Sequence, residues 1–189
     1  MNRVKSKGSV PTKSKGSVPK SDGSVPTKST GTVPQTVKGT VPKVLIEGAV
    51  PKDFGVSKAE VKAAAAYFAQ RSSTRVEMRF HEVVVHLIRD AESDEMHQAI
   101  MGVTGATDVI TQAYDAIPPE EPGIFGELFV NTDQARRAAP KRKDWDIAHE
   151  LLLYIAHGMD HLSGADDHSE HDFATMRRRE LGWLRSLPA

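Results

Sequence analysis

The sequence contains no cysteine among its 189 residues. This absence excludes disulfides, thiolate metal sites and a cysteine nucleophile, and it is compatible with a reducing cytoplasm. No stretch approaches the roughly 18 consecutive apolar residues of a membrane-spanning helix, and the N-terminus lacks the apolar segment of a secretory signal. We therefore expect a cytoplasmic chain without a membrane partner.

Net charge is also absent, but the two parts of the chain differ in charge. The 25 basic residues equal the 25 acidic residues in number. Residues 1–52 hold 10 basic and 2 acidic residues, a net charge of +8, whereas residues 53–189 hold 15 and 23, a net charge of −8. This contrast indicates that two compositionally different pieces are joined.

A short repeat, Gly-Ser/Thr-Val-Pro, fills the basic piece. Each unit carries one valine and one helix-breaking proline, so no unit can bury a face against the next. We predict a disordered basic tail over residues 1–43, with weak electrostatic attraction to RNA, and a folded domain over residues 44–189. The repeats begin at Gly8, Gly16, Gly23, Gly31 and Gly39, and a Gly-Ala-Val-Pro variant begins at Gly48.

The second piece alternates helical and strand patterns. A capping box at Ser57 precedes an alanine-rich helix over residues 61–70, and the β-branched run at residues 83–88 predicts a central strand. This interleaving predicts an α+β (α/β-like) fold, in which a small mixed sheet of about four strands packs with helices. Further helices are expected at 93–101 (capped by Ser93 or Asp94), 132–138, 144–163 and 169–187, with Phe173 on the apolar stripe of the last one, and strands at 44–46, 107–111 and 126–130.

The strongest chemical pattern lies near the C-terminus. His157 and His161 are four residues apart, which places both on one face of the predicted helix. Gly164 ends that helix, and the turn after it carries Asp-Asp-His at residues 166–168. This is the pattern of a metal site with two ligands on a helix and one on a turn. A chain with eight histidines often contains such a pair by chance. The prediction of a metal site therefore depends largely on the glycine and on the residues after it.

Position 158 separates this pattern from that of a zinc peptidase. The HExxH motif of those enzymes has a glutamate, the general base, directly after the first histidine. Gly158 stands at that position here. The sequence therefore disfavours a metallopeptidase.

These residues resemble the signature of the YbeY family, metal-dependent endoribonucleases of ribosomal RNA maturation. Residues 157–164 read His-Gly-x-x-His-Leu-x-Gly and are followed by Asp-His, as in the family signature. The strand at residues 107–111, Thr-Asp-Val-Ile-Thr, is similar to the family's TDVLSF or TDVITF strand, and residues 126–130 are similar to its GDI or GEI strand. Met176-x3-Glu180 resembles the family's M-x3-E segment. The resemblance covers residues 76–189 well and residues 44–75 loosely.

The resemblance implies a compact metalloprotein whose metal-site helix is arranged as in zincins. It implies one zinc-type ion held by three side chains, with His157 and His161 as two of the ligands. The implied activity is hydrolysis of single-stranded RNA in small-subunit ribosomal RNA maturation and ribosome quality control. Ribosomal RNA and the small ribosomal subunit are then the expected partners, and DNA is not.

The third ligand has two candidates. The family motif places its last histidine six residues after the second one, where this chain has Asp167, and His168 follows. An unchanged turn length favours Asp167, whereas the softer ligand chemistry of imidazole favours His168, and zinc accepts both. The turn length weighs slightly more, and both residues stay candidates.

Other departures from the family bear on activity. Met101 stands where many members have an arginine that suits contact with a phosphate, and Gln112 replaces a phenylalanine. Asp160 replaces a leucine beside the ligands, and Asp160 and Asp166 are the candidates for a general base. Met101 favours an alternative function, a metal-stabilised ribosome-assembly factor without catalysis. Candidate RNA-binding basic patches are Arg136, Arg137, Lys141, Arg142 and Lys143, and Arg177 to Arg179.

Overall fold

The computed structural model describes residues 42–76, 79–116 and 123–188. The predicted tail and its electrostatic role therefore lie almost wholly outside the described residues. The described ranges belong to one compact unit. None of their helices combines the length and the hydropathy that a bilayer crossing requires.

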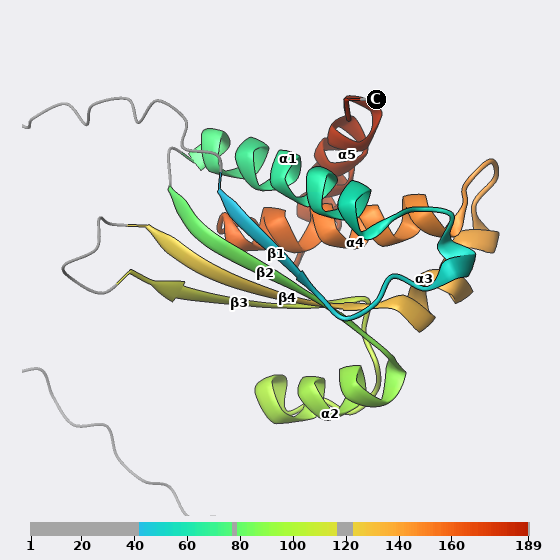
Figure 1. Ribbon diagram of the computed structural model, residues 1–189. Coiled ribbons are helices and arrows are strands. Elements are labelled where there is room, and N and C mark those ends of the chain that lie inside the picture. Colours follow the sequence, from blue (N-terminus) through green and yellow to red (C-terminus); the bar gives the residue numbers. More distant parts are fainter. Residues whose placement is uncertain (1–41, 77–78, 117–122, 189) are drawn as a thin grey trace, which may run out of the picture. The chain divides into compact units, whose positions relative to one another are not determined.

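A four-stranded mixed sheet forms the centre of the domain (Figure 1). Its strands are β1 (Lys43–Glu47), β2 (Phe80–Ile88), β3 (Val109–Asp115) and β4 (Ile124–Asn131), in the order β1-β2-β4-β3. The β1–β2 and β2–β4 pairs are parallel, whereas β3 runs antiparallel to β4. The structure thus confirms the predicted α+β fold with a small mixed sheet.

Helices lie on both faces of the sheet. Helices α1 (Lys58–Val76) and α4 (Ile147–Leu162) cover one face, and α2 (Asp90–Met101) lies on the other (Figure 1). Helix α5 (Glu170–Arg185) packs on α4, and α3 (Thr132–Ala138) follows β4 directly. Two short 3-10 helices span Lys52–Phe54 and Ala139–Lys141.

Helix α4 is the most enclosed element of the domain. Eleven of its sixteen residues are buried, because the sheet, α1 and α5 contact it on several sides. Its apolar side chains, such as Leu151 and Ile155, join those of α1 and the central strands in one core. The same enclosure buries three polar side chains, each of which has a partner described below. These are Glu150, His157 and Asp160.

Several local predictions differ from the structure. Helix α1 extends to Val76, beyond the predicted end. Helix α2 begins at Asp90, because the Glu92 carboxylate accepts a hydrogen bond from the Arg89 backbone and caps the helix earlier than predicted. The predicted cap, Ser93, instead lies buried inside α2, where its hydroxyl bonds to the backbone of Thr107. Phe173 is 45% exposed, because only the Met176, Glu180 and Trp183 side of α5 is buried.

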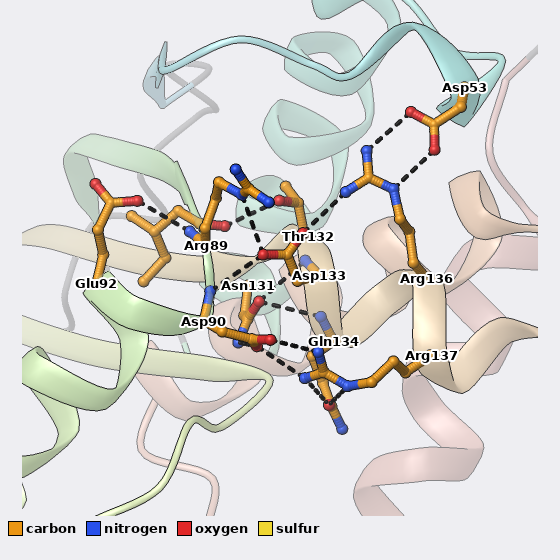
Figure 2. A network of polar contacts seen from close by, with 11 residues as sticks. Asp53, Arg89, Asp90, Glu92, Asn131, Thr132, Asp133, Gln134, Arg136 and Arg137 are labelled. Atoms are coloured by element: carbon orange, nitrogen blue, oxygen red, sulfur yellow. Dashed lines mark hydrogen bonds and ion pairs between the residues drawn. The ribbon is translucent and has the colours of Figure 1, made fainter.

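Ion pairs join the chain segments that follow the parallel strands (Figure 2). The Arg136 guanidinium donates to both carboxylate oxygens of Asp53, at 2.7 and 2.9 Å, and to Asp133 at 2.9 Å. Arg137 pairs with Asp90, and its Nη2 lies 2.8 Å from Asp90 Oδ1. This pairing lowers the pKa of Asp90 to about 2. Two arginines of the first predicted basic patch are therefore compensated by carboxylates.

Helix α4 lies close to the sheet at Gly158. A Cβ atom at this position would lie 2.8 Å from Leu128 Cδ2 and 3.1 Å from Val109 Cγ2. The missing side chain therefore allows the helix backbone to rest on β3 and β4. The glutamate of an HExxH peptidase would have no room at this position.

We predict that Gly158→Ala lowers the free energy of unfolding by about 1–3 kcal/mol, because Leu128 and Val109 must move within a closed core. The matched control is Gly182→Ala in α5, where a Cβ would meet nothing within 4 Å. That variant should be stabilising by about 0.5–1 kcal/mol, since alanine is the better helix former. Urea unfolding measures both variants, and equal stabilities would contradict the close contact at Gly158.

Candidate metal centre

Helix α4 and the turn after it bring the candidate ligands together. The Asp146 carboxylate caps the helix by accepting from the His149 backbone at 2.8 Å. At the other end Gly164 has a φ of 79°, and the Ala165 N–H donates to the Asp160 carbonyl at 3.1 Å. This left-handed turn reverses the chain, so Asp167 returns to the face that carries the two histidines.

Three side chains converge at this point. His157 Nε2 and His161 Nε2 lie 3.2 Å apart. One carboxylate oxygen of Asp167 is 3.6 Å from His157 Nε2, and the other is 3.9 Å from His161 Nε2. One ligand atom from each residue lies within 4.8 Å of the other two, so the group could hold a metal ion.

The outer nitrogens of both rings already have partners. His161 Nδ1 is 2.9 Å from the Ala165 carbonyl oxygen, which can only accept, so Nδ1 carries the proton. His157 Nδ1 lies 2.7 Å from Glu180 Oε1 and likewise donates to a carboxylate. In the neutral rings both Nε2 lone pairs therefore face each other and the Asp167 carboxylate. Two nitrogen lone pairs and a carboxylate that face one another repel each other, and a cation bound between them would relieve this repulsion.

The spacing of the three side chains fits a tetrahedral ion. With bonds of about 2.0–2.1 Å, the ligand atoms of a tetrahedral zinc site lie about 3.3–3.4 Å apart. The two imidazole nitrogens, 3.2 Å apart, lie close to that value. The Asp167 oxygens lie somewhat beyond it, with Oδ2 3.6 Å from His157 Nε2 and Oδ1 3.9 Å from His161 Nε2. Two imidazoles and one carboxylate also match a site that leaves a fourth position for water or substrate.

Glu180 positions the more buried histidine. His157 is 6% exposed and Glu180 is fully buried, so their hydrogen bond is shielded from water. Burial disfavours the imidazolium, but the hydrogen bond and charge of Glu180, with the charge of Asp108, outweigh it and raise the pKa of His157. The second Glu180 oxygen lies 3.2 Å from Arg177 Nη1, which offsets part of the buried charge.

The remaining sequence candidates lie elsewhere. The side chain of His168 is 88% exposed, and its Nδ1 pairs with Asp166, which is also exposed. The Asp160 side chain is fully buried and pairs with Arg179, whose Nε lies 2.8 Å from Asp160 Oδ2, and with Arg75 at 3.4 Å. Burial raises the pKa of Asp160, while the two guanidinium groups oppose that shift. The structure thus brings Asp167, and not His168, Asp166 or the Asp160 carboxylate, to the two histidines.

The positioning role of Glu180 and the Ala165 carbonyl contact are absent from the sequence predictions. A signal for Glu180 exists, because this acid follows Met176 by four residues and precedes Trp183 by three, on the buried side of α5. No local signal identifies Ala165, since its contribution is a backbone carbonyl whose direction depends on the turn.

A family model described as Endoribonuclease YbeY matches residues 51–188. The chain belongs to the YbeY family. A protein named Endoribonuclease YbeY from Kineococcus radiotolerans is 32% identical over 159 residues, which are 77% of this chain and 87% of the relative. One of the same name from Micrococcus luteus is 30% identical over 136 residues, 63% and 83% of the two chains. A solution structure of a Thermotoga maritima protein, 20% identical, covers 77% of this chain and 93% of that chain with a TM-score of 0.42.

The family assignment confirms the resemblance read from the sequence, and the relatives' names support an RNA-cleaving hydrolase. Two departures from the YbeY signature can be located. Met101 is 62% exposed at the end of α2, and Gln112 lies on β3, where its side chain accepts a hydrogen bond from the Tyr114 hydroxyl at 2.7 Å. Neither residue belongs to the group of converging ligands.

We predict that His157→Ala and Asp167→Ala each remove most of the metal bound by the purified protein, because each deletes one of three donors. His168→Ala is the matched control and should retain it, since that imidazole faces solvent. Elemental analysis after gel filtration measures the ratio of metal to protein. Loss of metal from His168→Ala together with retention by Asp167→Ala would contradict the ligand geometry.

We also predict that Glu180→Gln changes how the stability of the metal-free protein depends on pH. The pKa of His157 in the folded protein lies above its ordinary value of 6.5, so protonation of this histidine stabilises the fold. This stabilisation is complete below pH 6.5 and is lost as the pH rises through the folded-state pKa. Replacing the Glu180 carboxylate removes the main cause that raises this pKa. The stability difference between wild type and variant should therefore shrink as the pH increases, as measured by urea unfolding in chelator. A difference independent of pH contradicts this assignment.

Proposed function

We propose that this chain is a metal-dependent endoribonuclease that cleaves single-stranded RNA by hydrolysis. The observation that carries the proposal is the convergence of His157, His161 and Asp167 in a chain of the YbeY family. The relatives' name, Endoribonuclease YbeY, supplies the substrate class. We further propose zinc as the ion, because two imidazoles and one carboxylate suit it.

The three converging residues would hold the ion, and the protein's other groups prepare the site. When bound, a zinc-type ion would act as a Lewis acid on a phosphoryl oxygen and lower the pKa of a water molecule. Glu180 holds the proton of His157 at Nδ1, which keeps Nε2 available as a ligand atom. The Ala165 carbonyl does the same for His161. Gly158 allows this part of α4 to lie directly on the sheet.

We place the activity in maturation of small-subunit ribosomal RNA and in ribosome quality control, in the cytoplasm. Ribosomal RNA and the small ribosomal subunit are the proposed partners, without a role for DNA or membranes. Residues 53–189 have a net charge of −8, so RNA must be bound by a local basic surface against the average charge of the domain.

A second candidate function is a metal-stabilised assembly factor that binds ribosomal partners without cleavage. The observation that favours it is Met101, because a thioether at an exposed position gives a phosphate no charged hydrogen bond. The two candidates share the metal site and differ in whether RNA is cleaved.

RNA cleavage by the purified full-length chain tests the proposal. We expect wild type with zinc to cleave an unstructured oligoribonucleotide, and His157→Ala to lose at least about 100-fold in rate, since removing a ligand removes the Lewis acid, worth several kcal/mol. His168→Ala should cleave within about two-fold of wild type, as a surface substitution away from the site. Metal-loaded wild type that leaves RNA intact with zinc, manganese and magnesium would reject the enzyme and support the assembly factor.

A further inference from the structure

Four arginines of the predicted basic patches face carboxylates in the folded domain. Arg136 and Arg137 pair with carboxylates near the strand ends, as Figure 2 shows. Arg177 faces Glu180, and Arg142 lies 3.0 Å from the buried Glu150 carboxylate. These four arginines are therefore less available to a polyanion than the sequence alone suggests.

A groove of about 450 Å³ lies between α1 and α5. Three guanidinium groups line it, those of Arg71, Arg75 and Arg179, together with the rings of Tyr67 and Trp183. The remaining lining side chains are an amide and a hydroxyl, so no carboxylate of the described residues lines the groove. We call this surface the Arg71 groove.

The spacing of residues along two helices explains why these side chains line one groove. On α1 the residues at 67, 70, 71 and 74 fall at i, i+3, i+4 and i+7, which is one face of a helix. On α5, Arg179 and Trp183 are four apart and fall on one face in the same way. These faces meet because α1 and α5 both pack against α4.

The charge of the groove is largely uncompensated. Arg71 donates from Nε to the Tyr67 hydroxyl at 3.0 Å and lies 5.0 Å from the centre of that ring, and within the described ranges no carboxylate pairs with it. Arg75 and Arg179 share the single buried carboxylate of Asp160. Three positive charges thus stand against one negative charge, and the Arg71 side chain is exposed.

This combination of groups matches a nucleotide. Arginine binds phosphate with two parallel charge-assisted hydrogen bonds, and an aromatic ring or a guanidinium plane stacks on a base. Gln70 and Thr74 add polar atoms at the rim, where base edges and the ribose 2′-hydroxyl need partners. An acidic peptide would use the charges and leave the rings without a role.

The groove continues toward the metal centre. Arg75 and Arg179 also line an adjoining hollow of about 180 Å³, together with Ala165 and the carboxylates of Asp166 and Asp172. Ala165 accepts the hydrogen bond from His161 and precedes Asp167 by two residues. Arg75 also donates to the Ser163 carbonyl at 3.3 Å. A strand held in the groove would therefore run toward the turn that carries Asp167.

We infer that the Arg71 groove binds a nucleotide of the single-stranded RNA substrate, outside the bond that is cleaved. The direction of the RNA strand in this inference rests on the proposed function. The assignment of a nucleotide as the ligand rests on the side chains that line the groove. Arg71 supplies a phosphate contact and Tyr67 a stacking surface. Arg75 and Arg179 join this surface to helix α4 through Asp160.

Binding of a fluorescent oligoribonucleotide with phosphorothioate linkages to the full-length protein, followed by anisotropy over a salt series, tests the inference. Arg71→Ala should weaken binding about 5- to 10-fold at low salt and reduce the salt slope by about one, because one phosphate contact is lost. Tyr67→Leu should weaken binding at least about five-fold, whereas Tyr67→Phe should bind within about two-fold of wild type. A gel confirms that the probe stays intact, and thermal unfolding confirms that each variant is folded.

Lys62→Ala is the matched control, because it removes one charge from the same helix. Lys62 is exposed and nine residues before Arg71, about half a turn around α1 on the opposite face. It should bind RNA within about two-fold of wild type. Equal losses from Arg71→Ala and Lys62→Ala would overturn the groove in favour of diffuse charge attraction.

Two further outcomes are informative. An oligoaspartate peptide of equal charge should compete poorly, and competition as strong as that of RNA would overturn the nucleotide assignment in favour of an acidic protein partner. Failure of the inference is separable from failure of the proposed function, because binding is measured without cleavage. Wild type that cleaves RNA but binds it independently of Arg71 overturns only the groove, whereas Arg71-dependent binding without cleavage supports the groove and rejects the nuclease.

Discussion

The candidate metal centre depends on one buried hydrogen bond, between His157 and Glu180. The two residues lie on different helices, both are almost completely enclosed, and the nitrogen and oxygen are 2.7 Å apart. A buried carboxylate without a partner costs several kcal/mol, so this contact also fixes how α5 lies on α4. Because it occupies Nδ1, the other nitrogen of His157 faces His161 and Asp167, and the chemistry of the site follows from that orientation.

A second contact joins the same two helices about one turn further along α4. Asp160 takes part in ion pairs with Arg179 of α5 and Arg75 of α1. The YbeY signature read from the sequence has leucine at this position, so this chain replaces apolar packing by a buried charge with two partners. This buried charge also affects the protein surface, because the two arginines that neutralise Asp160 line the Arg71 groove. The same ion pairs therefore hold α4 in place and gather positive charge near the candidate metal centre.

Prediction from the sequence succeeded where a pattern is local and failed where a partner comes from a distant segment. The strand at residues 83–88 and the helix that carries His157 and His161 have clear periodicity, and both are present. The start of α2 was wrong, because Ser93 finds its partner in Thr107, fourteen residues away. The basic patch at residues 136–143 has less free charge than its sequence suggests, since Asp53 and Asp90 reach Arg136 and Arg137 from far along the chain.

The sequence by itself determined the class of fold, the family, and the pair of histidines on one helix face, because each follows from patterns that are local to individual segments and from the order of those segments. Only the tertiary structure decided which residue meets that pair. Asp167 and His168 are neighbours in sequence, but the left-handed turn at Gly164 directs Asp167 inward and leaves His168 in solvent. The partners of His157 and Asp160 were likewise set by how α1 and α5 pack on α4. The physical reason is that the direction of a side chain after a turn, and the neighbour of a buried polar group, depend on contacts between segments far apart in the chain.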